Sequence, residues 1–91
     1  MRDAEAPRAV FTVYSRSYCH LCDELLAELQ AVLAGWERPA VFAIDVVDVD
    51  GDEALETRHG ERVPVLEYAG RELCHYRLDA EKVREVLGAL G

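Results

Sequence analysis

Two cysteines, Cys19 and Cys22, are the residues of this chain whose type and spacing point most directly to chemistry. Residues three apart on a helix lie on one face, so two such thiols are close enough to form a disulfide in a small ring. The apolar run from Val10 to Tyr14 predicts a buried strand before them, and the leucines after them recur at helical spacing. A C-x-x-C at a strand-to-helix junction indicates thiol–disulfide redox chemistry.

The two thiols are expected to have different roles. Cys19 lies nearer the start of the predicted helix, where unpaired backbone amides favour a thiolate, so we assign it as the nucleophile. Cys22 lies one turn further in and is assigned as the resolving thiol that attacks the mixed disulfide. His20, between them, either stabilises the thiolate through a positive charge or is a solvated helix residue, and both readings remain open.

Composition limits the class of protein. The 91 residues predict a single domain over 1–91. The 18 acidic and 10 basic residues give a net charge of −8, which disfavours nucleic acid and anionic membranes as partners. There is no apolar stretch of signal-peptide or membrane-spanning length, so we expect a cytoplasmic monomer. In that reducing compartment a cysteine pair is more often catalytic than structural.

The elements that would position the pair can be read along the chain. The first helix is predicted to end at Gly35, and the apolar run 40–44 predicts a second strand, parallel to the first and buried on both faces. An acidic loop follows, in which Asp50 or Asp52 is expected to cap a short helix running to about His59.

The last third of the sequence predicts a hairpin and a helix. Segments 63–68 and 72–76 alternate as two antiparallel strands, with Pro64 tolerated at the head of the first. Asp79 then precedes an apolar stripe and is predicted to cap the final helix. The predicted order is β-α-β-α-β-β-α.

This order, with C-x-x-C at the first helix and Val63-Pro64 before the third strand, resembles the thioredoxin fold. The local details look most like small bacterial glutaredoxin-like proteins with a Tyr-x-Arg-x-x-Cys-x-Leu-Cys signature, which here spans residues 14–22. The resemblance implies an α/β fold with a central four-stranded mixed sheet flanked by helices.

The resemblance also implies residues that bind substrate. In the family the strand-leading proline is cis and faces the cysteines, which carries over to Pro64, and the backbone of Val63 would lie along a substrate. Arg16 stands where glutathione-using glutaredoxins have a lysine, and it retains the charge that holds a glutathione carboxylate. Asp79 matches an acidic residue of the family's glutathione site, and Tyr18 would offer a flat face to a partner.

The glycine pair that accompanies that acidic residue in glutaredoxins is replaced here by Tyr76-Arg77. We therefore expect a disulfide reductase that acts on protein or low-molecular-weight disulfides, with glutathione as a weak co-substrate and without a resident cofactor or metal.

Two classes of alternative remain beside this expectation. One is a thioredoxin-fold binding module without enzymatic activity. The other is a metal-binding glutaredoxin-like protein, either with an iron–sulfur cluster or with zinc held by Cys19, Cys22 and Cys74 or His75, although the ligand spacing is not that of paired zinc motifs. Cys74 itself is interpreted as a buried strand residue that behaves as a small hydrophobe, rather than as a third redox group.

Overall fold

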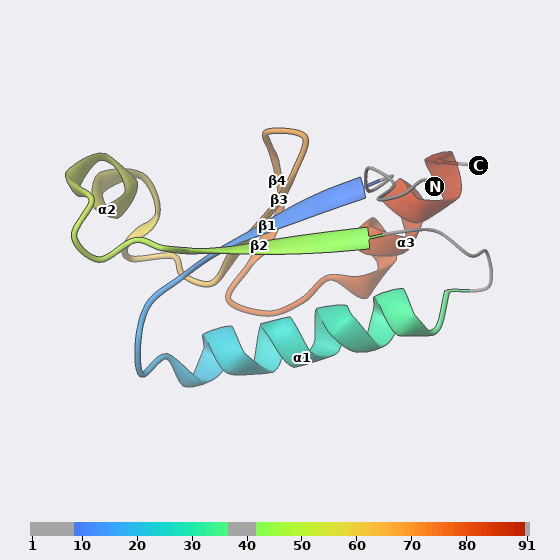
Figure 1. Cartoon of the computed structure of the whole chain (residues 1–91), viewed down its shortest axis with the longest axis horizontal. Helices are drawn as coiled ribbons and strands as arrows, with labels where there is room; N and C mark the ends of the chain where they lie inside the picture. The colour runs from blue at the N-terminus through green and yellow to red at the C-terminus, as the bar shows by residue number, and fades with distance from the viewer. Residues whose placement is uncertain (1–8, 37–41, 91) are drawn as a thin grey trace, which may run out of the picture.

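A computed structural model describes residues 9–36 and 42–90 of the chain. Its elements follow the predicted order (Figure 1). They are β1 (Ala9–Ser15), α1 (His20–Ala34), β2 (Phe42–Asp48), α2 (Glu53–His59), β3 (Val65–Tyr68), β4 (Arg71–His75) and α3 (Ala80–Ala89).

The four strands form one mixed sheet in the order β2-β1-β3-β4. β1 pairs in parallel with β2 and antiparallel with β3, and β3 pairs antiparallel with β4. A parallel neighbour on one side of β1 and an antiparallel one on the other is the arrangement of a thioredoxin-like sheet, as the sequence led us to expect.

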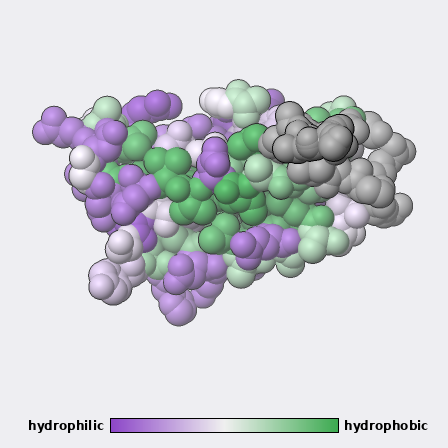
Figure 2. Space-filling view, viewed as in Figure 1, coloured by the Kyte–Doolittle hydropathy of each residue, from purple (hydrophilic) through white to green (hydrophobic). Residues whose placement is uncertain are grey.

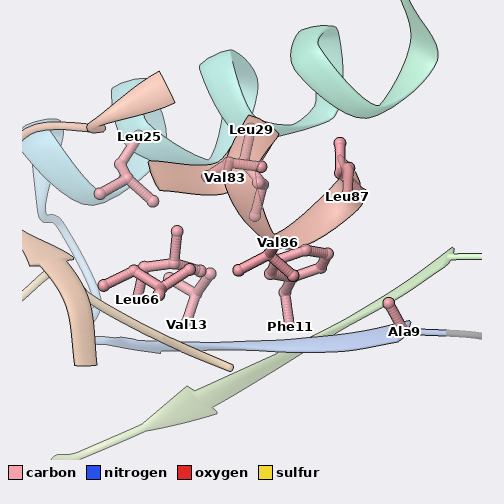
Figure 3. Packing of buried hydrophobic residues seen from close by; sticks show 10 residues of the cluster. Ala9, Phe11, Val13, Leu25, Leu29, Leu66, Val83, Val86 and Leu87 are labelled. Carbon is pink, nitrogen blue, oxygen red and sulfur yellow. The ribbon is translucent and has the colours of Figure 1, made fainter. Parts of the chain in front are cut away.

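α1 and α3 pack against one face of the sheet, and the core lies between the sheet and these two helices (Figure 3). Phe11 and Val13 point into this core from β1, and Leu29 of α1 meets them from the helix side; all three are at most 1% exposed. Helical spacing on α1 and alternation on β1 place these side chains toward each other. The other core residues are Ala9, Leu25, Leu66, Leu73, Val83, Val86 and Leu87.

The second strand differs from the prediction. It extends to Asp48 rather than ending near Ile44, because its residues stay in parallel register with β1 as far as Ser15. It is also an edge strand, so the prediction that the run 40–44 is buried on both faces was wrong: Phe42, Ala43 and Ile44 are only partly buried, and the strand continues into exposed residues. Its predicted start at 40–41 lies outside the described residues.

α2 is closed at both ends by the residues that the sequence suggested. The carboxylate of Asp52 accepts a hydrogen bond from the Leu55 amide at 3.1 Å, which identifies Asp52 rather than Asp50 as the cap. Gly60 ends the helix for a steric reason, since a Cβ there would lie 2.5 Å from the Glu56 carbonyl oxygen. The absence of a side chain lets the chain turn closely around the helix end.

The cysteine pair and the ends of the described chain lie at opposite ends of the molecule. The loop between β1 and α1 carries Cys19 and lies at the same end as α2, whereas β1 begins and α3 ends at the other (Figure 1). This follows from the parallel β1–α1–β2 crossover, which collects the carboxyl ends of both strands on one side.

Removal of the Asp79 cap should loosen α3. The Asp79 carboxylate accepts a hydrogen bond from the Lys82 amide at 3.2 Å, and α3 carries Val83 and Leu87 into the core. We expect Asp79→Ala to lower the free energy of unfolding by about 0.5–2 kcal/mol in urea titrations. Asp79→Asn, which retains a capping oxygen, should stay close to wild type, and equal loss in both variants would contradict a capping role.

Candidate active site

Cys19 and Cys22 form a disulfide across the first turn of α1, with their Cα atoms 5.2 Å apart. Cys19 is the N-cap of the helix, and its Sγ accepts a hydrogen bond from the Cys22 amide at 3.1 Å. Cys22 is only 3% exposed, whereas Cys19 is half-buried. In the reduced protein the more accessible sulfur is thus the one that faces a helix N-terminal amide, which stabilises a thiolate.

The two residues that flank Cys19 in the sequence have exposed side chains. Tyr18 has a fully exposed side chain and a φ of 59°, an uncommon conformation for a bulky residue that directs the ring away from the domain. The ring of His20 is also exposed and lies 3.6 Å from the Glu24 carboxylate, its helical neighbour. An exposed aromatic ring thus stands beside the accessible sulfur, without contributing to the core.

The Val63–Pro64 peptide bond is cis, as predicted. Pro64 is buried, and Val63 is half-buried. Tyr14, near the end of β1, is paired with Val65. Pro64 therefore lies beside the carboxyl end of β1, from which the cysteine loop departs. The topology therefore brings Val63 and Pro64 to the end of the molecule that carries the cysteine pair.

Tyr76, which the sequence singled out only as a replacement for a glycine of the glutathione site, takes part in this region. Its backbone amide donates to the Pro64 carbonyl at 2.8 Å, and its hydroxyl donates to the Glu61 carbonyl at 2.8 Å. These bonds, together with a φ of 67°, place the side chain against the segment that leads into Pro64. The sequence signal was a tyrosine where glutaredoxins have glycine, but the bond to Glu61 depends on tertiary structure.

Arg16 lies in the loop before the cysteines, with its guanidinium between two acids. Its Nη2 is 3.3 Å from the Asp50 carboxylate and 3.5 Å from that of Glu56. With Glu53 and Glu61 it also lines a pocket of about 350 Å³. A ligand carboxylate at Arg16 would therefore have to compete with carboxylates of the protein itself.

Asp79, which precedes α3, contacts Cys74 of β4. The Asp79 amide donates to the Cys74 Sγ at 3.4 Å, while the Asp79 carboxylate caps α3. Within the described part of the chain, no three His, Cys, Asp or Glu side chains are grouped so that they could hold a metal ion. The zinc alternative thus has no ligand set there.

We expect Cys74 to react slowly with alkylating reagents. Burial raises the pKa of its thiol, and the hydrogen bond from Asp79 offsets this only in part, so the thiolate is scarce at neutral pH. In a Cys19→Ser/Cys22→Ser variant, iodoacetamide at pH 8 should modify Cys74 more slowly in the folded protein than in urea. Equal rates would show that Cys74 is accessible and ionised in the fold.

His59 is a buried group that sequence reasoning treated only as the end of a helix. Its ring stacks on Tyr14 with centroids 4.2 Å apart, and its Nε2 is 3.8 Å from the Glu67 carboxylate. Both partners lie on the sheet, one on β1 and one on β3. This contact joins α2 to the strand that leads into the cysteine loop.

Comparison with known proteins gives a family for the chain. The model of the glutaredoxin-like domain (DUF836) matches residues 10–88. The chain belongs to this family. The solution structure of protein Ne2328 from Nitrosomonas europaea is 34% identical, with a TM-score of 0.73 over 94% of this chain and 98% of that one. Protein XcR50 from X. campestris, solved by X-ray diffraction, is 41% identical, with a TM-score of 0.67 over 87% and 96%.

The wider fold of this glutaredoxin-like domain is that of thioredoxin. Deadhead, a germline-specific thioredoxin from Drosophila melanogaster, superimposes with a TM-score of 0.51 over 91% of this chain and 81% of its own, at 20% identity. No curated protein sequence matches the chain. None of the described helices is long and apolar enough to cross a membrane.

Proposed function

We propose that this glutaredoxin-like domain is a thiol–disulfide oxidoreductase that reduces protein disulfides, with Cys19 as nucleophile and Cys22 as resolving thiol. The observation that carries the proposal is the asymmetry of the pair: Cys19 is accessible at the start of α1, and Cys22 is buried at bonding distance behind it. Thiol–disulfide exchange needs one thiol that a substrate disulfide can reach. It also needs a second, sheltered thiol that reacts with the mixed disulfide once it has formed.

The reaction consists of two exchanges. The Cys19 thiolate attacks one sulfur of the substrate disulfide, so a mixed disulfide forms and the second substrate sulfur leaves as a thiolate. The Cys22 thiolate then attacks Cys19 Sγ, closing the Cys19–Cys22 disulfide and releasing the first substrate sulfur. Two electrons pass from the protein dithiol to the substrate, and water protonates the two departing thiolates.

Val63, before the cis proline, would align a substrate backbone as the resemblance implies. Two further features favour a polypeptide over glutathione as that substrate. The Arg16 guanidinium is already paired with Asp50 and Glu56. Tyr76 adds a ring beside the segment leading into Pro64, where a glycine would leave room for a small peptide.

Coupled turnover assays test this proposal. With glutathione and its reductase as the only electron source, we expect slow reduction of a glutathione mixed disulfide, whereas a protein disulfide should rapidly oxidise the reduced domain. Rates typical of an ordinary glutaredoxin in the first assay would overturn the assignment of substrate. A single stoichiometric oxidation with no turnover by any donor would point instead to a binding module.

Tyr76→Gly is the informative variant in this assay. Glycine adopts a φ of 67° without strain, so the substitution removes the ring while the backbone can stay as it is. If the ring limits access, glutathione-dependent turnover should rise severalfold. Tyr76→Phe, which loses only the hydroxyl bond to Glu61, serves as the matched control and should stay near wild type.

A further inference from the structure

The outer edge of β2 is an open strand. Within residues 9–36 and 42–90, β2 pairs only with β1, so the backbone N–H and C=O groups on its other side have no strand partner. The strand has seven residues, contains no lysine or proline, and carries Asp45 and Asp48 as its charged residues. Among the described residues, its outer edge is therefore unpaired and could accept an added strand.

Apolar side chains follow this edge. Val46 is 54% exposed, and Phe42 and Ile44 are only partly buried on the rim of the core. Leu26 and Leu33 of α1 are likewise partly buried against that core. Figure 2, which views the molecule from the side of β2, shows a continuous hydrophobic band across the middle of this face.

The two faces of β2 differ in chemistry. Ile44 and Val46 are in register with core residues of β1 and so lie on the helix-covered face of the sheet. Asp45 is in register with Thr12 and lies on the opposite face. A strand added alongside would meet apolar groups on one face and a carboxylate on the other.

β2 and α1 are both acidic: together they carry five carboxylates and neither lysine nor arginine. A second copy of the chain would bring the same acidic residues and a further net charge of −8 to the contact, which disfavours self-pairing. The five are Asp23, Glu24, Glu28, Asp45 and Asp48.

We propose that the β2 edge binds an extended segment of a basic partner protein, added as a fifth strand, in which apolar residues alternate with lysine or arginine. The apolar side chains would cover Ile44 and Val46, and the cationic ones, on the opposite face, would face Asp45. Main-chain hydrogen bonds hold such a segment, and the alternating side chains give selectivity. This inference does not depend on the redox chemistry of the cysteines.

A synthetic peptide of alternating valine and lysine, labelled for fluorescence anisotropy, tests the proposal. We expect saturable binding to the full chain, with amide signals of β2 shifting in NMR spectra. A peptide with glutamate in place of lysine, and one N-methylated at alternate amides so that it cannot pair as a strand, should both fail to bind.

Two single substitutions make the test specific. Val46→Lys places a charge in the apolar strip. We expect it to weaken binding about tenfold or more, because the apolar contact that the bound peptide would make with Val46 is lost. Ala89→Lys adds the same charge at an exposed residue of α3 and should leave affinity within about twofold, as expected for surface changes.

Other outcomes contradict the proposal. Equal loss in the two variants would indicate attraction by overall charge alone. Concentration-dependent dimers in sedimentation experiments that Val46→Lys disrupts would show that the edge pairs with a second copy. Binding of the peptide only after deletion of residues 1–8 would show that the edge is reserved for the chain's own N-terminal segment.

Discussion

Replacement of Cys22 by serine is expected to stop the reaction at a covalent mixed disulfide between Cys19 and the substrate. Serine cannot attack Cys19 Sγ, so the second exchange is lost while the first remains. Incubation of reduced Cys22→Ser with a disulfide-containing protein should therefore give an adduct that is stable on non-reducing gels and releases both proteins with dithiothreitol. Turnover should fall to the uncatalysed background.

Matched variants establish which sulfur reacts. Cys19→Ser retains a thiol, but one that is only 3% exposed, so it should yield little adduct. Both variants are best made with Cys74 replaced by alanine, so that every adduct reports on the pair. Faster adduct formation through Cys22 than through Cys19 would reverse the two roles and remove the basis for the proposed mechanism.

The largest effect on stability is expected at Phe11. Its ring is fully buried at the centre of the sheet, and its centroid lies 5.3 Å from that of Tyr68. Truncation to alanine removes the transfer free energy of the ring and leaves a cavity, at a cost of about 3–5 kcal/mol. Since small domains are stable by about 5–15 kcal/mol, this single change should bring the protein close to unfolding.

Urea titration followed by far-UV circular dichroism measures this loss. Val10→Ala is the natural control, because Val10 is the neighbouring residue but points to the other face of β1 and is exposed. It should change the free energy of unfolding by no more than about 0.5 kcal/mol. A similar loss in both variants would mean that the core does not lie where the structure places it.

Much of the fold could be predicted because it rests on local rules. Leu25 and Leu29 repeat at helical spacing, and Asp52 and Asp79 stand where helix caps are required, so each helix could be located from a few residues. The position of the cysteine pair could be predicted in the same way, because an apolar strand pattern precedes it and a helical leucine pattern follows it. The cis state of Val63–Pro64 was expected only because this chain resembles a family in which that proline is cis.

Features set by tertiary context were missed. An apolar run such as the start of β2 reads alike in a central strand and at an edge, and only the sheet order decides which. The partners of Arg16 come from the loop after β2 and from α2, which local patterns cannot place beside it. The bond from Tyr76 to Glu61 spans fifteen residues and depends on how the hairpin folds back.

The separation between the cysteine loop and both ends of the described chain bears on how the domain can be joined to other proteins. A tether attached before β1 or after α3 would leave from the end of the molecule opposite to Cys19 (Figure 1). A fused enzyme, a surface or a fluorophore held there would leave the reactive sulfur facing solution. The architecture thus suits use as a module that is anchored at one end and presents the cysteine pair at the other.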